Sequence, residues 1–140
     1  MEEISLSTEK LELMREKWHP DCFACGGSGM KIKHTVASEN YLESLFFCDD
    51  KFCGYGNKMH GGIITTLLDS AMTNCLFAAG IAAVTGELKI RFFKPVIPGK
   101  NLSVKAWITD CKSPLYALKS ALYQDGRLKS RASAKFMKIN

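Results

Sequence analysis

The stretch M-H-G-G-I-I-T-T-L-L-D-S-A-M, residues 59–72, determines how the rest of this chain has to fold. From residue 61 to about residue 79, apolar side chains recur with helical spacing on nearly every side. A helix of this kind has to be buried on most of its surface. The pattern therefore predicts a central helix over residues 61–79 that Gly80 ends. Two features do not fit a purely structural helix: it begins with two glycines, and a carboxylate, Asp69, interrupts its apolar run.

The segments around this helix alternate in the manner of β-strands. The predicted strands are residues 31–37 and 41–48 before the helix, and residues 83–93, 102–108, 116–123 and 129–137 after it. The Ala and Leu content of 116–123 would also allow a helix. A short amphipathic helix precedes all of these elements, with Ser7 as its N-cap and Pro20 at its end.

One long apolar helix and a meander of amphipathic strands predict an α+β domain. The antiparallel sheet has to wrap around the helix, because no other part of the chain can bury it. We divide the chain into an N-terminal helix, residues 1–18, and a single domain, residues 19–140. With 140 residues, 46% of them hydrophobic, the chain is long enough for one such domain and too short for two.

The composition indicates which partners this protein binds and where in the cell it is located. The net charge of +5 is not gathered into runs, and no aromatic residues are set into a basic patch, so we expect no nucleic-acid partner. The first ten residues are acidic and lack the apolar core of a signal peptide. Asp69, Asn74 and Gly80 interrupt the most apolar stretch, which favours a buried helix over a membrane span. We therefore expect a cytoplasmic protein that is not in a membrane.

The two odd features of the central helix together predict a catalytic site. The first N–H groups of a helix have no internal partner, and glycines there let another group approach them. The Gly61 N–H could thus polarise a carbonyl oxygen as an oxyanion hole does. Asp69 shares a stripe with Thr65 and Thr73, and a carboxylate on an apolar helix is often a general base or nucleophile. The alternative is that this stripe meets solvent or an Arg of a partner chain.

His60 has two possible roles. As a general base it would indicate a dehydratase-type enzyme. A histidine at a helix start more often caps the helix or braces the loop before it.

Several segments resemble one known family. G-Y-G-N-K-M-H-G-G-I-I-T-T-L-L-D-S-A-M, residues 54–72, is similar to the signature of hotdog-fold acyl-CoA thioesterases, in the phenylacetate-pathway-like (PaaI-like) and 4-hydroxybenzoyl-CoA-like branch. In that branch H-G-G opens the central helix, and an acidic residue follows nine positions after the histidine. F-F-K-P-V-I-P-G-K and D-G-R-L-K-S-R-A-S-A-K-F-M also resemble the branch, as does H-P-D-C-F-A-C-G near the start.

The resemblance implies a hydrolase in which a sheet wraps the central helix. The active unit would be at least a homodimer, often a homotetramer. Each site would combine the Gly61 N–H of one chain with Asp69 of the other, as general base or nucleophile at the thioester carbonyl. Thr85 matches a position where some relatives carry a hydroxyl that helps to hold the water or the leaving group. The substrate would be an acyl-CoA, and no cofactor is implied beyond the coenzyme A of the substrate.

One departure concerns the attacking water. Several relatives carry Asn or Gln six residues before the histidine, and this chain has Gly54 there. The alternatives are a non-catalytic acyl-CoA-binding module, and a hydratase or dehydratase that uses His60. We expect the substrate to contact Gly62, Asn57, Thr73, Arg91 and Lys94, the last two because coenzyme A is an anion.

Six cysteines raise the question of a disulfide scaffold or a metal site. They are Cys22, Cys25, Cys48, Cys53, Cys75 and Cys111. Without a secretory signal we expect reduced thiols. Cys22 and Cys25 could form half of a zinc site with Cys48 and Cys53 as the other half, but the looser C-D-D-K-F-C spacing argues against it. We therefore predict no bound metal.

Overall fold

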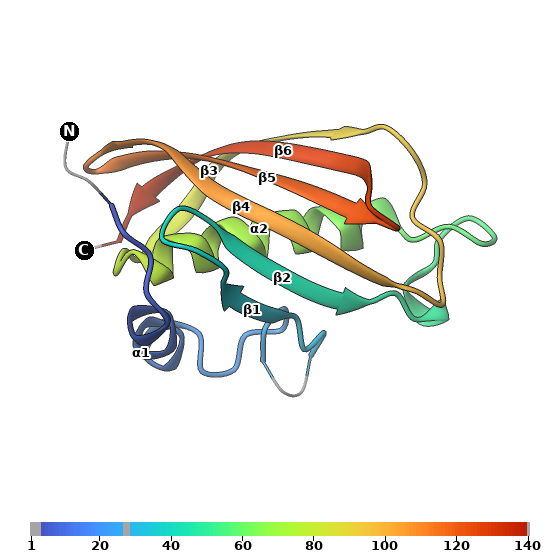
Figure 1. Cartoon of the computed structure of the whole chain (residues 1–140), viewed down its shortest axis with the longest axis horizontal. Helices are drawn as coiled ribbons and strands as arrows, with labels where there is room; N and C mark the ends of the chain where they lie inside the picture. Colours follow the sequence, from blue (N-terminus) through green and yellow to red (C-terminus); the bar gives the residue numbers. More distant parts are fainter. Residues whose placement is uncertain (1–3, 27–28, 140) are drawn as a thin grey trace.

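The computed structural model describes residues 4–26 and 29–139 (Figure 1). The elements are α1 (Thr8–Trp18), β1 (Lys33–Val36), β2 (Leu42–Phe47), a short 3-10 helix η1 (Asp50–Phe52), α2 (Gly61–Ala78), β3 (Ala83–Phe92), β4 (Asn101–Lys112), β5 (Leu115–Gln124) and β6 (Arg127–Lys138). All strand pairs are antiparallel, and the six strands form one sheet in the order β1-β2-β4-β5-β6-β3.

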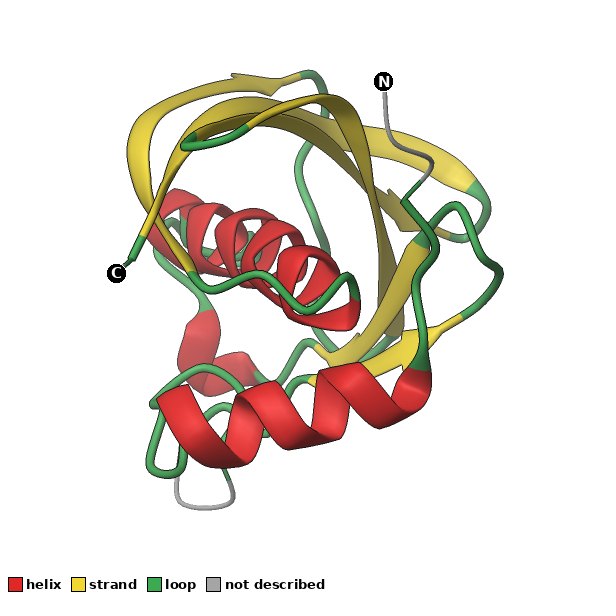
Figure 2. Ribbon diagram, turned by 90° about the vertical axis from the view of Figure 1, so that its left-hand side faces the viewer, coloured by secondary structure: helices red, strands yellow, loops and turns green. Residues whose placement is uncertain are grey.

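The sheet curls around α2, so that the helix runs through its hollow side (Figure 2). Eleven residues of α2 are buried, and its half-buried or exposed positions lie on one side and at its N-terminus. The predicted α+β fold, with a sheet wrapped around one long helix and a short N-terminal helix, is confirmed. No helix within the described ranges is long and apolar enough to cross a membrane.

The short helix α1 packs against α2 at the open side of the sheet (Figure 2). Ser7 is its N-cap: the side-chain oxygen accepts a hydrogen bond from the Lys10 N–H at 3.2 Å. Leu11 is the buried residue of this helix and belongs to the same core as α2.

The structure corrects or settles three details of the sequence prediction. Residues 116–123 lie in a strand, because β5 pairs along its length with both β4 and β6. β4 continues to Lys112 instead of ending at residue 108, since its pairing with β5 resumes after an irregularity between Ile108 and Asp110. The glycine-rich connection before α2 contains η1, which Asp49 caps by accepting from the Lys51 N–H.

Burial of α2 should contribute much of the free energy of unfolding. Leu68 is fully buried, whereas Leu13 on α1 is 67% exposed. We expect Leu68→Ala to lower the free energy of unfolding by about 2–5 kcal/mol, because it leaves a cavity in a packed core. The matched change Leu13→Ala should alter it by about 0.5 kcal/mol or less. Denaturant titration at one protein concentration measures both, and equal losses would contradict this account of the core.

Candidate active site

The N-terminus of α2 offers one free backbone donor. His60 is the N-cap, and its Nδ1 accepts a hydrogen bond from the Gly62 N–H at 2.8 Å. Among the described residues, nothing accepts from the Gly61 N–H, which is the first of the helix. The hydroxyl of Thr65 turns back to donate to the Gly61 carbonyl at 2.8 Å. The Gly61 N–H is therefore available to an oxygen from outside the chain, at the positive end of the helix dipole.

The imidazole of His60 packs over Gly54. A Cβ placed on Gly54 would lie 3.2 Å from Cδ2 of His60 and 3.6 Å from its Cα. A Cβ at position 54 would therefore be in tight contact with the capping ring, which would have to shift by a few tenths of an ångström.

A cleft of about 620 Å³ opens beside this helix start. His60, Gly61 and Lys94 line it together with Gly54, Tyr55, Lys58, Met59, Ile64, Phe92, Phe93 and Pro95. Phe92 and Phe93 are 53% and 43% exposed, although they are large apolar residues. The sequence analysis missed them as site residues; the signal that could have found them is two consecutive aromatics directly before Lys94-Pro95.

Asp69 and Thr85 meet on the open side of α2. The Thr85 hydroxyl donates to Oδ1 of Asp69 at 2.6 Å. The pairing of β3 with β6 shifts between Thr85 and Glu87, an irregularity of the kind that re-aims a side chain. Burial raises the pKa of the Asp69 carboxyl, and the hydrogen bond from Thr85 opposes part of that rise. A half-buried carboxyl with a raised pKa is suited to accept a proton from water.

The other predicted contacts lie at different places. Thr73 is half-buried one turn beyond Asp69 on α2, and Gly62 gives its N–H to His60. Asn57 is exposed in the loop before the helix and does not line the cleft. Arg91 lines a separate hollow formed by β3, β4, β5 and β6. The structure thus brings His60, Gly61 and Lys94 together, and pairs Asp69 with Thr85, without bringing Asn57 or Arg91 to either group.

Within one chain the free N–H and the carboxylate are too far apart to act on the same carbonyl. Gly61 and Asp69 are separated by eight residues of one helix, which is about 12 Å at the usual helical rise. A single chain therefore carries two separate partial sites, one at the start of α2 and one around Asp69.

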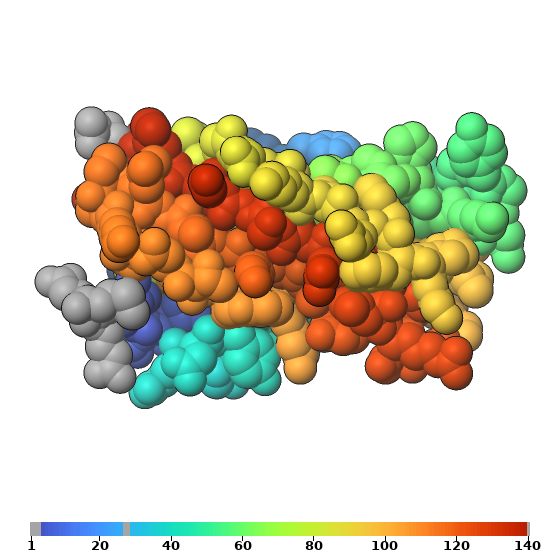
Figure 3. All heavy atoms as spheres, turned by 90° about the horizontal axis from the view of Figure 1, so that it is seen from above, coloured from blue at the N-terminus to red at the C-terminus, as the bar shows by residue number. Residues whose placement is uncertain are grey.

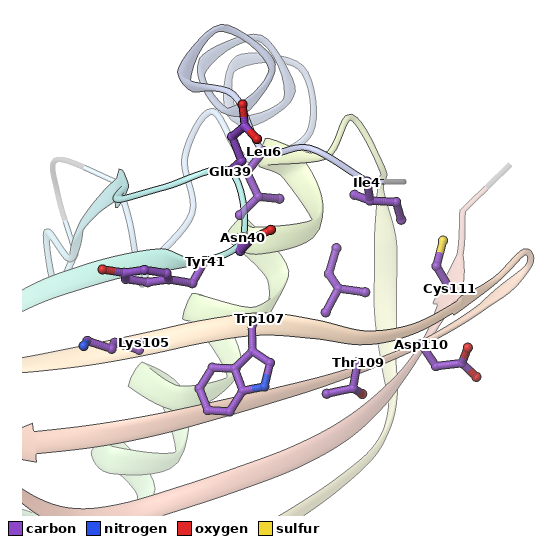
Figure 4. Close-up of a pocket in the computed structure, with 11 residues that line it drawn as sticks. Ile4, Leu6, Glu39, Asn40, Tyr41, Lys105, Trp107, Thr109, Asp110 and Cys111 are labelled. Atoms are coloured by element: carbon purple, nitrogen blue, oxygen red, sulfur yellow. The ribbon is translucent and has the colours of Figure 1, made fainter. Parts of the chain in front are cut away.

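A third hollow, of about 570 Å³, lies away from both partial sites. Side chains of the N-terminal segment, the β1–β2 turn and β4 line it, with Ile4 and Leu6 above Trp107 and Thr109 (Figure 4). None of the predicted site residues lines this hollow.

Comparison with known proteins shows which proteins this chain resembles. Residues 56–113 match the thioesterase superfamily. The PaaI protein of the Escherichia coli phenylacetic acid degradation operon has a similar structure, with 18% identity and a TM-score of 0.82 over 95% of this chain and 96% of that one. A phenylacetic acid degradation-related putative thioesterase of Ralstonia eutropha has 22% identity and a TM-score of 0.78, over 91% of this chain and 98% of that one.

A Streptococcus mutans protein solved with bound acetyl-CoA is also similar, at 18% identity and a TM-score of 0.73, over 78% of this chain and 89% of that one. No curated protein matches this chain. The hotdog fold predicted from the sequence is thus confirmed, as is the resemblance to the thioesterase superfamily.

The pairing of Thr85 with Asp69 predicts a change that can be measured on the resting protein. Thr85→Val removes the hydroxyl that stabilises the carboxylate, so the pKa of Asp69 should rise further. Thr85→Ser keeps a hydroxyl and should leave that pKa close to its value in the unmodified protein. The ¹³C chemical shift of the Asp69 carboxyl, followed by NMR against pH, reports both. An unchanged pKa in the valine variant would show that this hydrogen bond has no effect on the carboxyl.

Proposed function

From a hotdog fold whose central segment matches the thioesterase superfamily, we propose that this protein hydrolyses an acyl-CoA thioester to a free acid and coenzyme A. The observation that carries the proposal is the pair of complementary groups on α2: a free N–H at Gly61 and a half-buried carboxyl at Asp69. The similar Streptococcus mutans protein with acetyl-CoA bound supports this class of substrate.

Asp69 acts on the thioester as a general base or as the nucleophile. In the first case its carboxylate takes a proton from water while the water oxygen attacks the carbonyl carbon. The Gly61 N–H stabilises the negative charge that develops on the carbonyl oxygen. The C–S bond then breaks, and the thiolate of coenzyme A takes up the proton. Thr85 holds the carboxylate in place through its hydroxyl. The resident groups of the chain suffice, so we propose no further cofactor.

The minimal active unit is a homodimer in which Gly61 of one copy faces Asp69 of the other. Gly61 and Asp69 of one chain are separated by about 12 Å along α2, which supports this arrangement. So does β3, an edge strand of the sheet whose residues after Ala83 are largely exposed. In the view from above it runs beside β6 (Figure 3). An unpaired edge beside an open helix face is suited to pairing with a second copy. We propose two such dimers, a homotetramer, as the full assembly and the cytoplasm as its location.

The cleft beside Gly61 would take part of the substrate. Phe92 and Phe93 offer apolar surface there, and Lys58 and Lys94 supply positive charge. This combination suits a ligand with both an anionic and an apolar part. His60 is occupied as a helix cap through Nδ1, which supports hydrolysis over a dehydratase in which His60 is the base.

Replacing the carboxylate tests the proposed chemistry. Asp69→Asn keeps the shape of the side chain and removes the base, so thiol release from acyl-CoA should fall roughly a hundredfold or more. Asp125→Asn is the matched control, because Asp125 lies in the exposed β5–β6 turn, where it forms a salt bridge with exposed Lys100. The assay uses short, medium and aryl acyl-CoAs with a thiol reagent.

Two outcomes of this assay would contradict the proposal. Equal rates in the Asp69 variant and the unmodified protein would remove Asp69 from the mechanism. Tight binding of acyl-CoA without turnover of any substrate would favour the binding module. The rate of the active protein should also fall as the pH drops through the raised pKa of Asp69, because only the carboxylate accepts a proton.

Removing the Gly61 N–H tests whether this backbone donor takes part in the reaction. His60 has φ −62° and ψ 132°, which suits a residue before proline. Gly61→Pro should therefore keep the helix start, where proline is favoured, while deleting the N–H. We expect an activity loss of about a hundredfold to a thousandfold. Gly61→Ala keeps the N–H and adds a methyl with ordinary contacts to Phe92 at 3.6 and 3.7 Å, so it should lose less.

Mixed dimers complete the test. In a dimer of one Gly61→Pro chain and one Asp69→Asn chain, one of the two sites is intact if the chains share their sites. Two inactive variants, unfolded and refolded together in equal amounts, should recover about a quarter of normal activity, because half of the dimers are hybrids. Each variant refolded alone should stay inactive. No recovery in the mixture would contradict a site that two chains build.

A further inference from the structure

One cluster of chemically versatile side chains has no part in the proposed reaction. The cluster contains His19, Cys22 and Cys25. Each offers one ligand atom, and these three atoms lie within 4.8 Å of one another. They follow directly after α1, and none of them lines the cleft beside Gly61. Cys48 and Cys53, which the sequence offered as partners for Cys22 and Cys25, are not in this group.

The backbone holds Cys22 and Cys25 on one tight turn. The Gly26 N–H donates to the Cys22 carbonyl at 2.7 Å. A Cβ at Gly26 would lie 2.4 Å from that carbonyl oxygen, so the turn requires glycine directly after the second cysteine. The two residues between the cysteines are fixed as well: the Phe23 carbonyl accepts from the Met30 N–H at 2.7 Å, and the Ala24 carbonyl accepts from the Ile32 N–H at 3.1 Å.

His19 and Arg15 connect this turn to the two helices. His19 is the C-cap residue of α1, and its ring lies edge-on to Phe77 of α2, with ring centroids 4.9 Å apart. Arg15 donates to the Cys25 carbonyl at 3.0 Å and so ties the turn to α1. Nδ1 of His19 is buried and has no hydrogen-bond partner within the described part of the chain. A buried polar atom without a partner is costly, and a bound ion would supply one.

We propose that His19, Cys22 and Cys25 bind a zinc ion, with Nδ1 of His19 and the two cysteine sulfurs as ligands. Two thiolates and one imidazole form a soft donor set of the kind that tetrahedral zinc sites use. In such a site the ligand atoms lie roughly 3.5–3.8 Å apart. Atoms that lie within 4.8 Å of one another therefore have to approach by about 1.3 Å at most. Rotation of the half-exposed His19 and Cys22 side chains supplies that movement.

Charge balance is compatible with the Arg15 guanidinium nearby. Zinc binds thiolates, so the entering ion displaces one proton from each cysteine. The bound unit of one Zn²⁺ and two thiolates has no net charge, and the site gains no positive charge beside Arg15. The described residues provide three ligands, and water completes the tetrahedron in the fourth position.

The role of this ion is to link parts of the fold. It would join the end of α1 to the turn at residues 22–26, and through His19 it would fix the packing of α1 on Phe77 of α2. Because a ligand that binds only the folded state stabilises it, zinc should raise the melting temperature. The proposal is independent of the thioesterase reaction.

Metal content and ligand type test the proposal directly. The protein is purified without chelator under reducing conditions, reconstituted with zinc, and analysed by mass spectrometry for metal. We expect about one zinc per chain. X-ray absorption should show two sulfur neighbours at about 2.3 Å and light-atom neighbours at about 2.0 Å. Cobalt substitution should give the absorption bands of sulfur-ligated tetrahedral cobalt.

Substitutions distinguish zinc binding at this cluster from zinc binding by the other cysteines of the chain. Cys22→Ser and His19→Gln should weaken zinc binding by on the order of a hundredfold or more, since even residues outside the ligand set affect affinity by up to that factor. They should also abolish the rise in melting temperature on zinc addition. Cys53→Ser is the matched control and should behave as the unmodified protein, because Cys53 lies outside the cluster.

Three results would overturn the proposal: no zinc in the reduced, reconstituted protein, zinc retained at full affinity in Cys22→Ser, or loss of zinc in Cys53→Ser. A mass two hydrogens lower with no metal would indicate a disulfide in place of the zinc site. Circular dichroism of each variant confirms that it has folded. A loss of thioesterase activity in the Asp69 variant with zinc retained would show that the two sites are separate.

Discussion

The burial of α2 inside its own sheet is the constraint on which the rest of the structure depends. The helix is apolar on most sides, and 11 of its residues are buried. A sheet that curls around it satisfies that need, but it cannot close completely (Figure 2). The start of the helix and the side that carries Asp69 stay accessible. The open parts of this mostly buried helix are thus the parts to which we assign the proposed chemistry.

A single histidine organises the start of that helix. His60 takes the Gly62 N–H and leaves the Gly61 N–H free, so capping selects which backbone donor is available. Its ring also fills the space over Gly54. The same residue therefore selects the free donor and packs against the loop that precedes the helix.

The two clusters of polar chemistry lie on different elements and have different physical requirements. Asp69 and Thr85 join α2 to β3 through one hydrogen bond and face outward. His19, Cys22 and Cys25 lie on a turn that several backbone hydrogen bonds hold, and His19 packs on α2. The first pair suits proton transfer at an accessible surface. The second group suits a bound ion that fixes the N-terminal segment.

The sequence by itself determined the features that depend on local order: the central helix to within one residue, the cap at Ser7, and the stripe with Asp69. It also located the strands, although it left 116–123 open between strand and helix and ended β4 at residue 108 instead of Lys112. Helical spacing, capping residues and alternation are local and can be counted. Only the tertiary structure decided which residues meet across the chain. It placed Thr85 on Asp69, the His60 ring on Gly54, and His19 rather than Cys48 and Cys53 beside Cys22 and Cys25. These contacts depend on how the sheet curls and how the loops pack on it, and no local sequence pattern predicts either.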